Sequence, residues 1–119
     1  MYYQKTNQIM RKTVISFIFV LMSINLWGYD FKIDKIYYNF NSDSISVSVA
    51  SWSGSGEYTG KIVIPPKIIY NEKEYIVTEI DSNAFWDCMY VTSIIIPETV
   101  TKIGAGAFTW CYGMDSITL

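Results

Sequence analysis

The side chains that most often take part in catalysis are scarce in this chain. Its 119 residues include no histidine, two cysteines and 11 aspartates and glutamates. Without histidine, a Ser-His-Asp triad, a Cys-His pair and any histidine-ligated metal site are excluded. Two cysteines are too few to form a metal site by themselves. Catalysis would therefore have to depend on carboxylates.

The carboxylates do not follow the spacing of a known site. Glu79, Asp81, Asp87 and Glu98 lie close in sequence but lack the Asp-x-Asp-x-Asp-Gly pattern of a calcium loop. Glycoside hydrolysis needs two carboxylates held in a cleft, which two short coils do not build. The Ser-Gly run at residues 53–56 is not followed by Gly-Lys-Ser/Thr, so it is not a phosphate loop. We predict a solvated acidic surface, no enzyme activity, and no metal or other cofactor.

The first 28 residues have a composition of their own. Residues 1–12 carry three basic residues and no acid, and residues 14–27 are almost wholly apolar. A basic segment followed by a short apolar one is typical of a secretory signal peptide, and the apolar run is short for a membrane span. We predict a signal peptide over residues 1–28, cleaved after Gly28, which makes the protein exported, either secreted or at the cell surface. An uncleaved N-terminal anchor is the alternative.

The remaining chain is acidic. Residues 29–119 hold six lysines and all 11 acids, which gives a net charge of −5. Phosphate binding needs a basic face, so nucleic acid is excluded as a partner. Anionic lipid surfaces likewise attract basic segments, so the acidic chain should not dock on them. We therefore expect contact with a membrane only during export.

Short apolar runs of the kind found in β-strands dominate the start of this acidic part, and no long amphipathic helix is present. The run over residues 31–40 and the strictly alternating run over residues 45–49 predict a β-hairpin around a polar cluster at residues 41–44. The Ser-Gly-rich stretch at residues 51–57 is a loop by composition.

A second hairpin follows. Residues 62–64 predict a short strand that ends at two prolines, because proline cannot donate to a β-ladder. Residues 67–70 and 75–77 then flank a charged turn. We interpret residues 29–76 as a β-rich N-terminal cap with hairpins.

From Val77 onward the chain repeats itself at a spacing of 23 residues. The matching pairs are Val77/Val100, Thr78/Thr101, Ile80/Ile103, Ala84/Ala107, Phe85/Phe108, Cys88/Cys111, Val91/Met114, Ser93/Ser116, Ile94/Ile117 and Ile96/Leu119. A fixed period in the twenties is the signature of a leucine-rich-repeat solenoid, in which each coil is stabilised by its neighbours. We predict a mainly β fold, with about two coils over residues 77–119, the last one incomplete.

Each coil holds a segment of the form Leu-x-x-Leu-x-Leu. In the first coil, Ile94 and Ile96 should point into the core and Ile95 outward. The first coil departs from the second at Asp81, which stands where the second has Gly104 and should weaken the turn slightly. The predicted repeat core consists of Ile80, Ala84, Phe85, Cys88, Val91, Ile94, Ile96, Val100, Ile103, Ala107, Phe108, Cys111, Met114, Ile117 and Leu119.

These residues resemble the BspA-type leucine-rich repeat of bacterial surface proteins. The motif is Ile80-x-x-x-Ala84-Phe85-x-x-Cys88-x-x-Val91-x-Ser93-Ile94-x-Ile96-Pro97-x-x-Val100-Thr101-x-Ile103-Gly104, preceded by Tyr58-x-Gly60-x-Ile62-x-Ile64-Pro65 and Tyr75-x-Val77-Thr78. The resemblance covers residues 29–119 and is most specific over residues 77–119. It implies an exported protein, often from anaerobic gut or oral bacteria, that is associated with adhesion and host-protein binding and has no enzymatic activity.

The sequence stops inside the third strand of the repeat. Solenoids generally need about three or more repeats and polar caps, so we expect this chain to be the N-terminal, truncated portion of a longer array. Residues 117–119 would form an uncovered edge strand, which is a template for self-association.

Cys88 and Cys111 occupy equivalent positions in adjacent coils. The spacing of about 5 Å between stacked strands lies within the range for a disulfide. Side chains at equivalent positions of a ladder point the same way, however, which fits a bridge poorly. We favour two buried thiols that act as small apolar side chains, with a disulfide as the alternative.

Two groups of residues are candidates for partner binding. Val63, Ile95 and Thr118 should point outward from successive strands, and repeat proteins often bind partners on such a face. Their alternative role is to satisfy strand propensity.

The second group is aromatic. Trp86, Trp110 and Tyr112 lie between core positions of the coils, where they can stack on a glycan or anchor a protein. Packing against a neighbouring coil is the alternative. We hypothesise a non-catalytic binding or adhesion module of a bacterial cell surface, with an extracellular protein or glycan as its partner. The alternative is a structural capping fragment or remnant of a larger surface adhesin, without a ligand of its own.

Overall fold

The computed structural model describes residues 28–52 and 57–119. The predicted signal peptide, apart from Gly28, and most of the Ser-Gly-rich loop lie outside these residues. Within them, the chain forms nine strands and no helix, so the predicted mainly β class is confirmed. Accordingly, no helix in the described part of the chain is long and apolar enough to cross a membrane.

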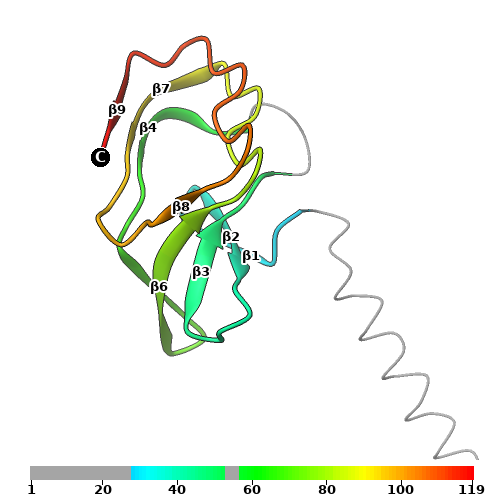
Figure 1. The fold of residues 1–119 in the computed structure, drawn as a ribbon, viewed down its shortest axis with the longest axis vertical. Helices are drawn as coiled ribbons and strands as arrows, with labels where there is room; N and C mark the ends of the chain where they lie inside the picture. Colours follow the sequence, from blue (N-terminus) through cyan, green and yellow to red (C-terminus); the bar gives the residue numbers. More distant parts are fainter. Residues whose placement is uncertain (1–27, 53–56) are drawn as a thin grey trace, which may run out of the picture.

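The strands form two sheets that share one hydrophobic core (Figure 1). The strands are β1 (Phe31–Ile33), β2 (Ile36–Phe40), β3 (Ser46–Val49), β4 (Thr59–Val63), β5 (Lys67–Tyr70), β6 (Lys73–Ile80), β7 (Tyr90–Ile95), β8 (Lys102–Ile103) and β9 (Ser116–Thr118). The first sheet has the order β1-β2-β3-β6-β5, with β8 also paired to β6, and the second has the order β4-β7-β9.

The predicted hairpins are present, with one difference. β2 and β3 pair antiparallel as expected, but the run over residues 31–40 is two strands, β1 and β2, which pair with each other. The chain turns at Asp34, which has a φ of 53°, a left-handed conformation that aspartate tolerates. The second hairpin, β5 with β6, turns through Asn71 and Glu72, both with positive φ, as in a tight hairpin turn whose twist matches the strands.

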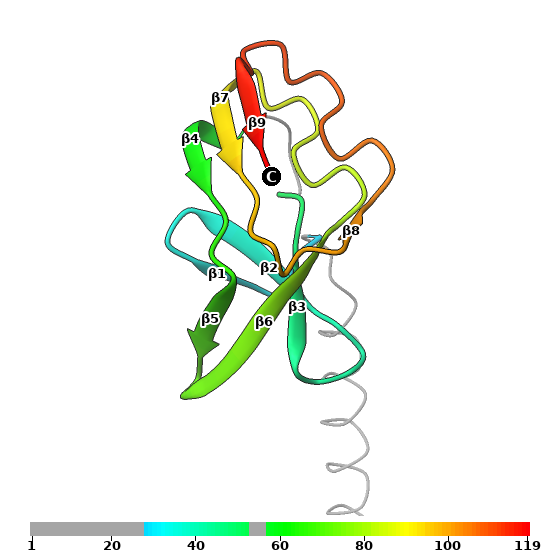
Figure 2. The same cartoon turned by 60° about the vertical axis from the view of Figure 1, so that its left-hand side comes forward.

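Residues that are 23 positions apart in the sequence pair with each other in two parallel ladders. Glu79 pairs with Lys102 between β6 and β8, and Ser93 pairs with Ser116 between β7 and β9. The turns are joined as well, because the Phe85 amide donates to the Ala107 carbonyl oxygen over 2.8 Å. Figure 2 shows β4, β7 and β9 side by side, with the turns of the coils on the opposite side. The predicted boundary between residues 76 and 77 lies inside β6, which pairs with both β3 and β8.

Most of the predicted repeat core is buried. The buried positions are Ile80, Ala84, Phe85, Cys88, Val91, Ile94, Ile96 and Ala107. Those that are partly buried against the core are Val100, Phe108, Cys111 and Met114.

The prediction is wrong for three positions in the second coil. Ile103 and Ile117 are 46% and 45% exposed, and Leu119 is 87% exposed. A coil buries its apolar side chains against neighbours on both sides. Among the described residues, nothing covers the outer side of this coil.

An aromatic column links the cap to the coils. The ring centroids of Tyr37 and Tyr58 are 5.7 Å apart, those of Tyr58 and Phe85 are 4.6 Å apart, and those of Phe85 and Phe108 are 5.6 Å apart. The buried Tyr58 hydroxyl accepts a hydrogen bond from the Tyr37 amide over 3.0 Å and donates one to the Ala50 carbonyl oxygen over 2.9 Å. Tyr58 therefore joins the coil rings to the ring of Tyr37 and satisfies two buried backbone groups of the cap.

Asp81, which we expected to weaken the turn of the first coil slightly, is hydrogen-bonded to the cap. Its amide donates to the Val49 carbonyl oxygen over 2.9 Å, and its carboxylate accepts a hydrogen bond from Asn39 Nδ2 over 3.0 Å. Gly104, its counterpart, lies directly on the preceding coil, where a Cβ would be 2.2 Å from the Ser82 nitrogen. Glycine is therefore required where one coil lies on another, whereas Asp81 joins the first coil to the cap.

Candidate functional site

The predicted outward strand face is formed by three strands in register. Val63 of β4 pairs with Ile95 of β7, and Ile95 pairs with Thr118 of β9. Val63 and Thr118 are exposed and Ile95 is partly exposed, whereas Ile94 and Ile96 are buried, as the alternation of a strand predicts. The structure therefore brings these three residues into one row of modest apolar character.

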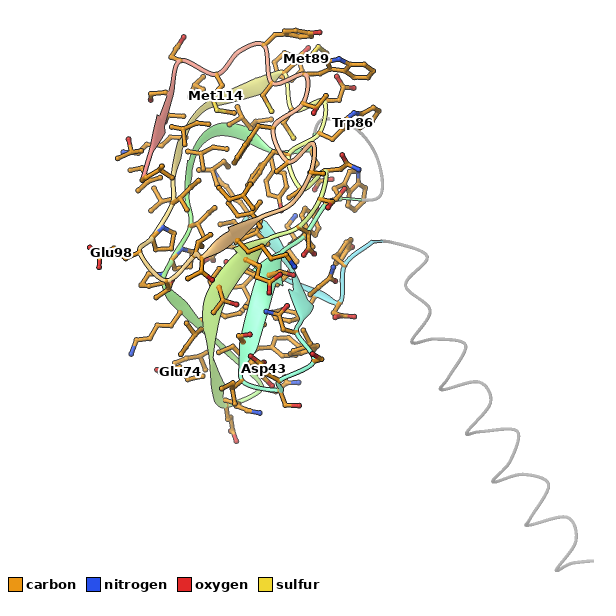
Figure 3. The ribbon with its side chains drawn as sticks, in the orientation of Figure 1. Asp43, Glu74, Trp86, Met89, Glu98 and Met114 are labelled. Carbon is orange, nitrogen blue, oxygen red and sulfur yellow. The ribbon has the colours of Figure 1, made fainter. Side chains whose placement is uncertain are left out.

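The predicted aromatic residues lie on the opposite side of the coils. Trp86 and Trp110 pack against each other with ring centroids 5.2 Å apart and planes tilted by 40°. They are nevertheless 38% and 50% exposed. In Figure 3, Trp86 and Met89 project from the turns on one side, whereas Glu98 projects on the other. Tyr112 is 78% exposed, and its ring contacts neither tryptophan. We call Trp86, Trp110 and Tyr112 the aromatic face.

The backbone at Trp110 has an uncommon conformation for so large a residue. Its φ is 62°, in the left-handed region, where a bulky side chain is a clear outlier. The equivalent residue 23 positions earlier is Asp87, with a φ of 56°, and aspartate tolerates this region. Backbone strain of this kind costs on the order of 1–3 kcal/mol. The two tryptophans do not occupy equivalent positions, since Trp86 aligns with Thr109. Only an alignment of the two coils shows that Trp110 stands where the first coil has an aspartate.

Cys88 and Cys111 are thiols, as we favoured, and do not form a disulfide. Cys111 Sγ donates a hydrogen bond to the Phe85 carbonyl oxygen over 2.9 Å. Burial raises the pKa of the Cys111 thiol, which lowers the fraction of reactive thiolate. These features are those of packed cysteines in a core rather than nucleophiles.

Two of the four acidic residues that we considered for chemistry, Glu79 and Asp81, have structural partners. The Glu79 carboxylate forms an ion pair with Lys102 over 3.2 Å, and Asp81 contacts the cap as described above. In residues 28–52 and 57–119, no group of three histidine, cysteine or acidic residues is arranged to hold a metal ion.

A groove beside the cap is the feature that the sequence did not predict. Its volume is about 640 Å³, and it is lined by residues 33–36, Tyr38, 61–63, Pro65 and 67–69. These segments come from three elements, the β1–β2 turn, β4 and β5, that do not share a pattern in the sequence. We call it the cap groove.

Next to the cap groove, a charged cluster fixes the β1–β2 hairpin to the start of β4. The Tyr37 hydroxyl donates to the Glu57 carboxylate, and the Lys32 ammonium lies 3.3 Å from the same carboxylate and 3.0 Å from the Tyr37 oxygen. The hydrogen bond from Tyr37, with a smaller effect of Lys32, lowers the pKa of Glu57. Burial is the main cause that raises the pKa of Tyr37. The Lys32 charge is therefore committed to this cluster.

Comparison with known proteins agrees with the repeat geometry. A family model for the BspA-type leucine-rich repeat region (6 copies) matches residues 61–119. A leucine-rich repeat protein from Bacteroides ovatus is 37% identical, with a TM-score of 0.68 over 76% of this chain. The chain belongs to the BspA-type leucine-rich repeat family. Proteins of this repeat family are generally non-catalytic.

Other solved leucine-rich repeat structures are similar over the same part of the chain. A leucine-rich cell surface protein from Faecalibacterium prausnitzii is 27% identical, with a TM-score of 0.61 over 73% of this chain. The T. pallidum leucine-rich repeat protein, 23% identical over 76% of this chain with a TM-score of 0.60, shares the fold. This chain spans 24%, 22% and 39% of the Bacteroides, Faecalibacterium and T. pallidum chains, respectively. No curated protein matches it.

Proposed function

We propose that this BspA-type chain is a non-catalytic binding module of an exported bacterial protein, and that the aromatic face holds an extracellular protein or glycan partner. Export is supported by the N-terminal basic and apolar segments and by the cell-surface protein among the similar structures. The absence of histidine and the structural partners of Glu79 and Asp81 support a binding role over catalysis.

The observation that carries this proposal is the conformation of Trp110. A tryptophan in the left-handed region is strained, and such strain persists only where other interactions compensate it, often at binding sites. The two rings contact each other, yet Trp86 stays 38% and Trp110 50% exposed, so the pair presents aromatic surface to solvent. Exposed aromatic pairs of this kind supply a large contact area at low entropic cost to a protein partner or a sugar ring.

The test uses a variant that removes the ring but retains the fold. Trp110→Asn places a residue that tolerates positive φ at this position, so the variant should keep the fold. The protein, purified from cells that express the full chain, is applied to an array of oligosaccharides and extracellular-matrix proteins. We expect binding to at least one class of probe, which Trp110→Asn and Trp86→Ala weaken at least about tenfold, as for an interface hot spot.

Ile45→Ala is the matched control, because Ile45 is an exposed apolar residue of the cap. It should leave binding unchanged. Binding that is equally strong in Trp110→Asn and Trp86→Ala, or absent from every probe, would contradict the aromatic face as a binding site.

A structural role is the second candidate, and the exposed end of the second coil favours it. Ile103, Ile117 and Leu119 present apolar side chains there, and β9 has a pairing partner on one side only within the described chain. We propose as the alternative that the chain caps further coils of a larger surface adhesin. In that case the cap and first coil serve to start the solenoid, without a ligand of their own.

A further inference from the structure

The cap groove runs along two strand edges. Three consecutive residues of β4 (61–63) and three of β5 (67–69) line it, although neighbouring side chains of a strand point to opposite faces. A groove that contacts three consecutive residues of a strand therefore follows the edge of that strand rather than one face. β4 and β5 are each the outermost strand of their sheet. In Figure 2 they follow each other down one side of the molecule, next to the β1–β2 hairpin.

The surface of the cap groove is apolar at its base and on its walls. Ile36, Tyr38, Ile62 and Ile68 form a buried base. Val63 and Ile69 also line the groove and are 55% and 69% exposed. Exposed β-branched side chains beside an open strand edge are a surface that a further extended chain can cover.

Positive charge gathers at this groove although the chain is acidic overall. Lys35, Lys61 and Lys67 line it, with Asp34 as the one acid among the lining residues. Lys67 forms an ion pair with Glu74 over 3.2 Å. Lys35 and Lys61 form no ion pair with any described residue.

The other lysines of the described chain are committed elsewhere. Lys32 pairs with Glu57 and Lys102 with Glu79, and Lys73 donates to the Ser44 carbonyl oxygen over 2.6 Å. Lys35, Lys61 and Lys73 therefore form no ion pair among the described residues, and two of these three, Lys35 and Lys61, line the same apolar groove. That arrangement is complementary to a ligand that carries both carboxylates and apolar groups.

We propose that the cap groove binds an extended acidic peptide segment of a partner protein, which adds a strand to the edge of β4. Its backbone pairs with the edge of β4, and its apolar side chains contact Val63 and Ile69. Its carboxylates lie near Lys35 and Lys61. This site shares no residue with the aromatic face, so the two proposals can fail separately.

An NMR titration tests the proposal. The ¹⁵N-labelled protein, purified from cells that express the full chain, is titrated with the peptide acetyl-Glu-Val-Glu-Val-Glu-Val-amide. We expect saturable shifts in the amide signals of residues 33–36, 61–63 and 67–69. The affinity should fall as the salt concentration rises, because exposed charges are screened. The double variant Lys35→Gln/Lys61→Gln should bind about tenfold more weakly.

Two controls isolate charge and location. Lys102→Gln also removes one positive charge but lies outside the groove, so it should leave the affinity unchanged. Trp110→Asn should likewise bind the peptide normally, which separates this site from the aromatic face.

Two further peptides separate the modes of binding. A peptide with lysine in place of glutamate should not bind, and a peptide N-methylated at alternate residues should bind at least tenfold more weakly, because it cannot pair with a strand edge. If the methylated peptide binds as tightly as the unmethylated one, strand addition is overturned, and the groove instead accepts any acidic apolar molecule. Equal binding of the lysine peptide, or shifts confined to other residues, would overturn the site.

Discussion

At the scale of single residues, Tyr58 shows how a polar atom fixes the start of the solenoid. Its ring continues the column of Phe85 and Phe108 into the cap, while its hydroxyl joins two backbone groups that no strand pairing satisfies. Burial raises the pKa of Tyr58 well above its ordinary value, so the hydroxyl stays protonated and able to donate. The sequence marks Tyr58 only as part of the family motif, because its two partners lie 8 and 21 residues away.

Tyr58→Phe removes the hydroxyl and retains the ring. The Tyr37 amide and the Ala50 carbonyl group would then be buried without this partner, so the free energy of unfolding should fall by about 1–3 kcal/mol. Urea denaturation followed by circular dichroism measures the change. Tyr112→Phe is the matched control, because that ring is exposed and its hydroxyl lies at the surface. Equal stability of both variants would show that the hydroxyl bridge contributes nothing.

At the scale of elements, the stacking of one coil on another decides where glycine is needed. Gly104 and Gly113 each lie against the backbone of the preceding coil, where a Cβ would be 2.2 Å from Ser82 N or Met89 O. Because these positions face the coil before them, the first coil does not need glycine at Asp81. The period of 23 residues could be read from the sequence, since equivalent side chains occupy equivalent places. The close contact between Gly104 and the backbone of Ser82 could not be read from the sequence, because it depends on the distance between coils.

Gly104→Ala should destabilise the second coil. The methyl group would collide with backbone atoms of Ser82 that cannot move away as a flexible side chain would, so we expect a loss of about 1–3 kcal/mol. Hydrogen exchange should show faster exchange at the amides of Thr101 and Gly104, which bond to the coil below. Ala105→Ser, one residue further on and exposed, is the control and should be neutral. Unchanged protection in Gly104→Ala would contradict the close packing of the two coils.

At the scale of the whole molecule, the two ends of the parallel β4-β7-β9 sheet differ in character. The β4 edge borders the cap groove, whereas the β9 edge adjoins exposed core positions of the second coil. An open strand with apolar neighbours is a template for pairing with another chain. Self-association through β9 therefore remains a prediction of the fold.

Sedimentation velocity tests that prediction. We expect the sedimentation coefficient of the full chain to rise with protein concentration. Thr118→Lys should suppress the rise, because lysine on an edge strand opposes pairing. Thr101→Lys adds the same charge at an exposed position outside β9 and should leave the association intact. A wild-type coefficient that does not change with concentration would exclude this mode of association.

The order of residues was sufficient to predict the coil. Apolar positions repeat at a fixed spacing, and stacking converts that spacing directly into strand register, so the β7–β9 pairing, with Ile95 beside Thr118, followed from local pattern. Tertiary structure alone decided three things: the exposure of Ile103, the left-handed backbone of Trp110, and the existence of the cap groove. The physical reason is the same in each case. Burial and open edges depend on which segments, distant in sequence, cover one another, and spacing along the chain does not contain that information.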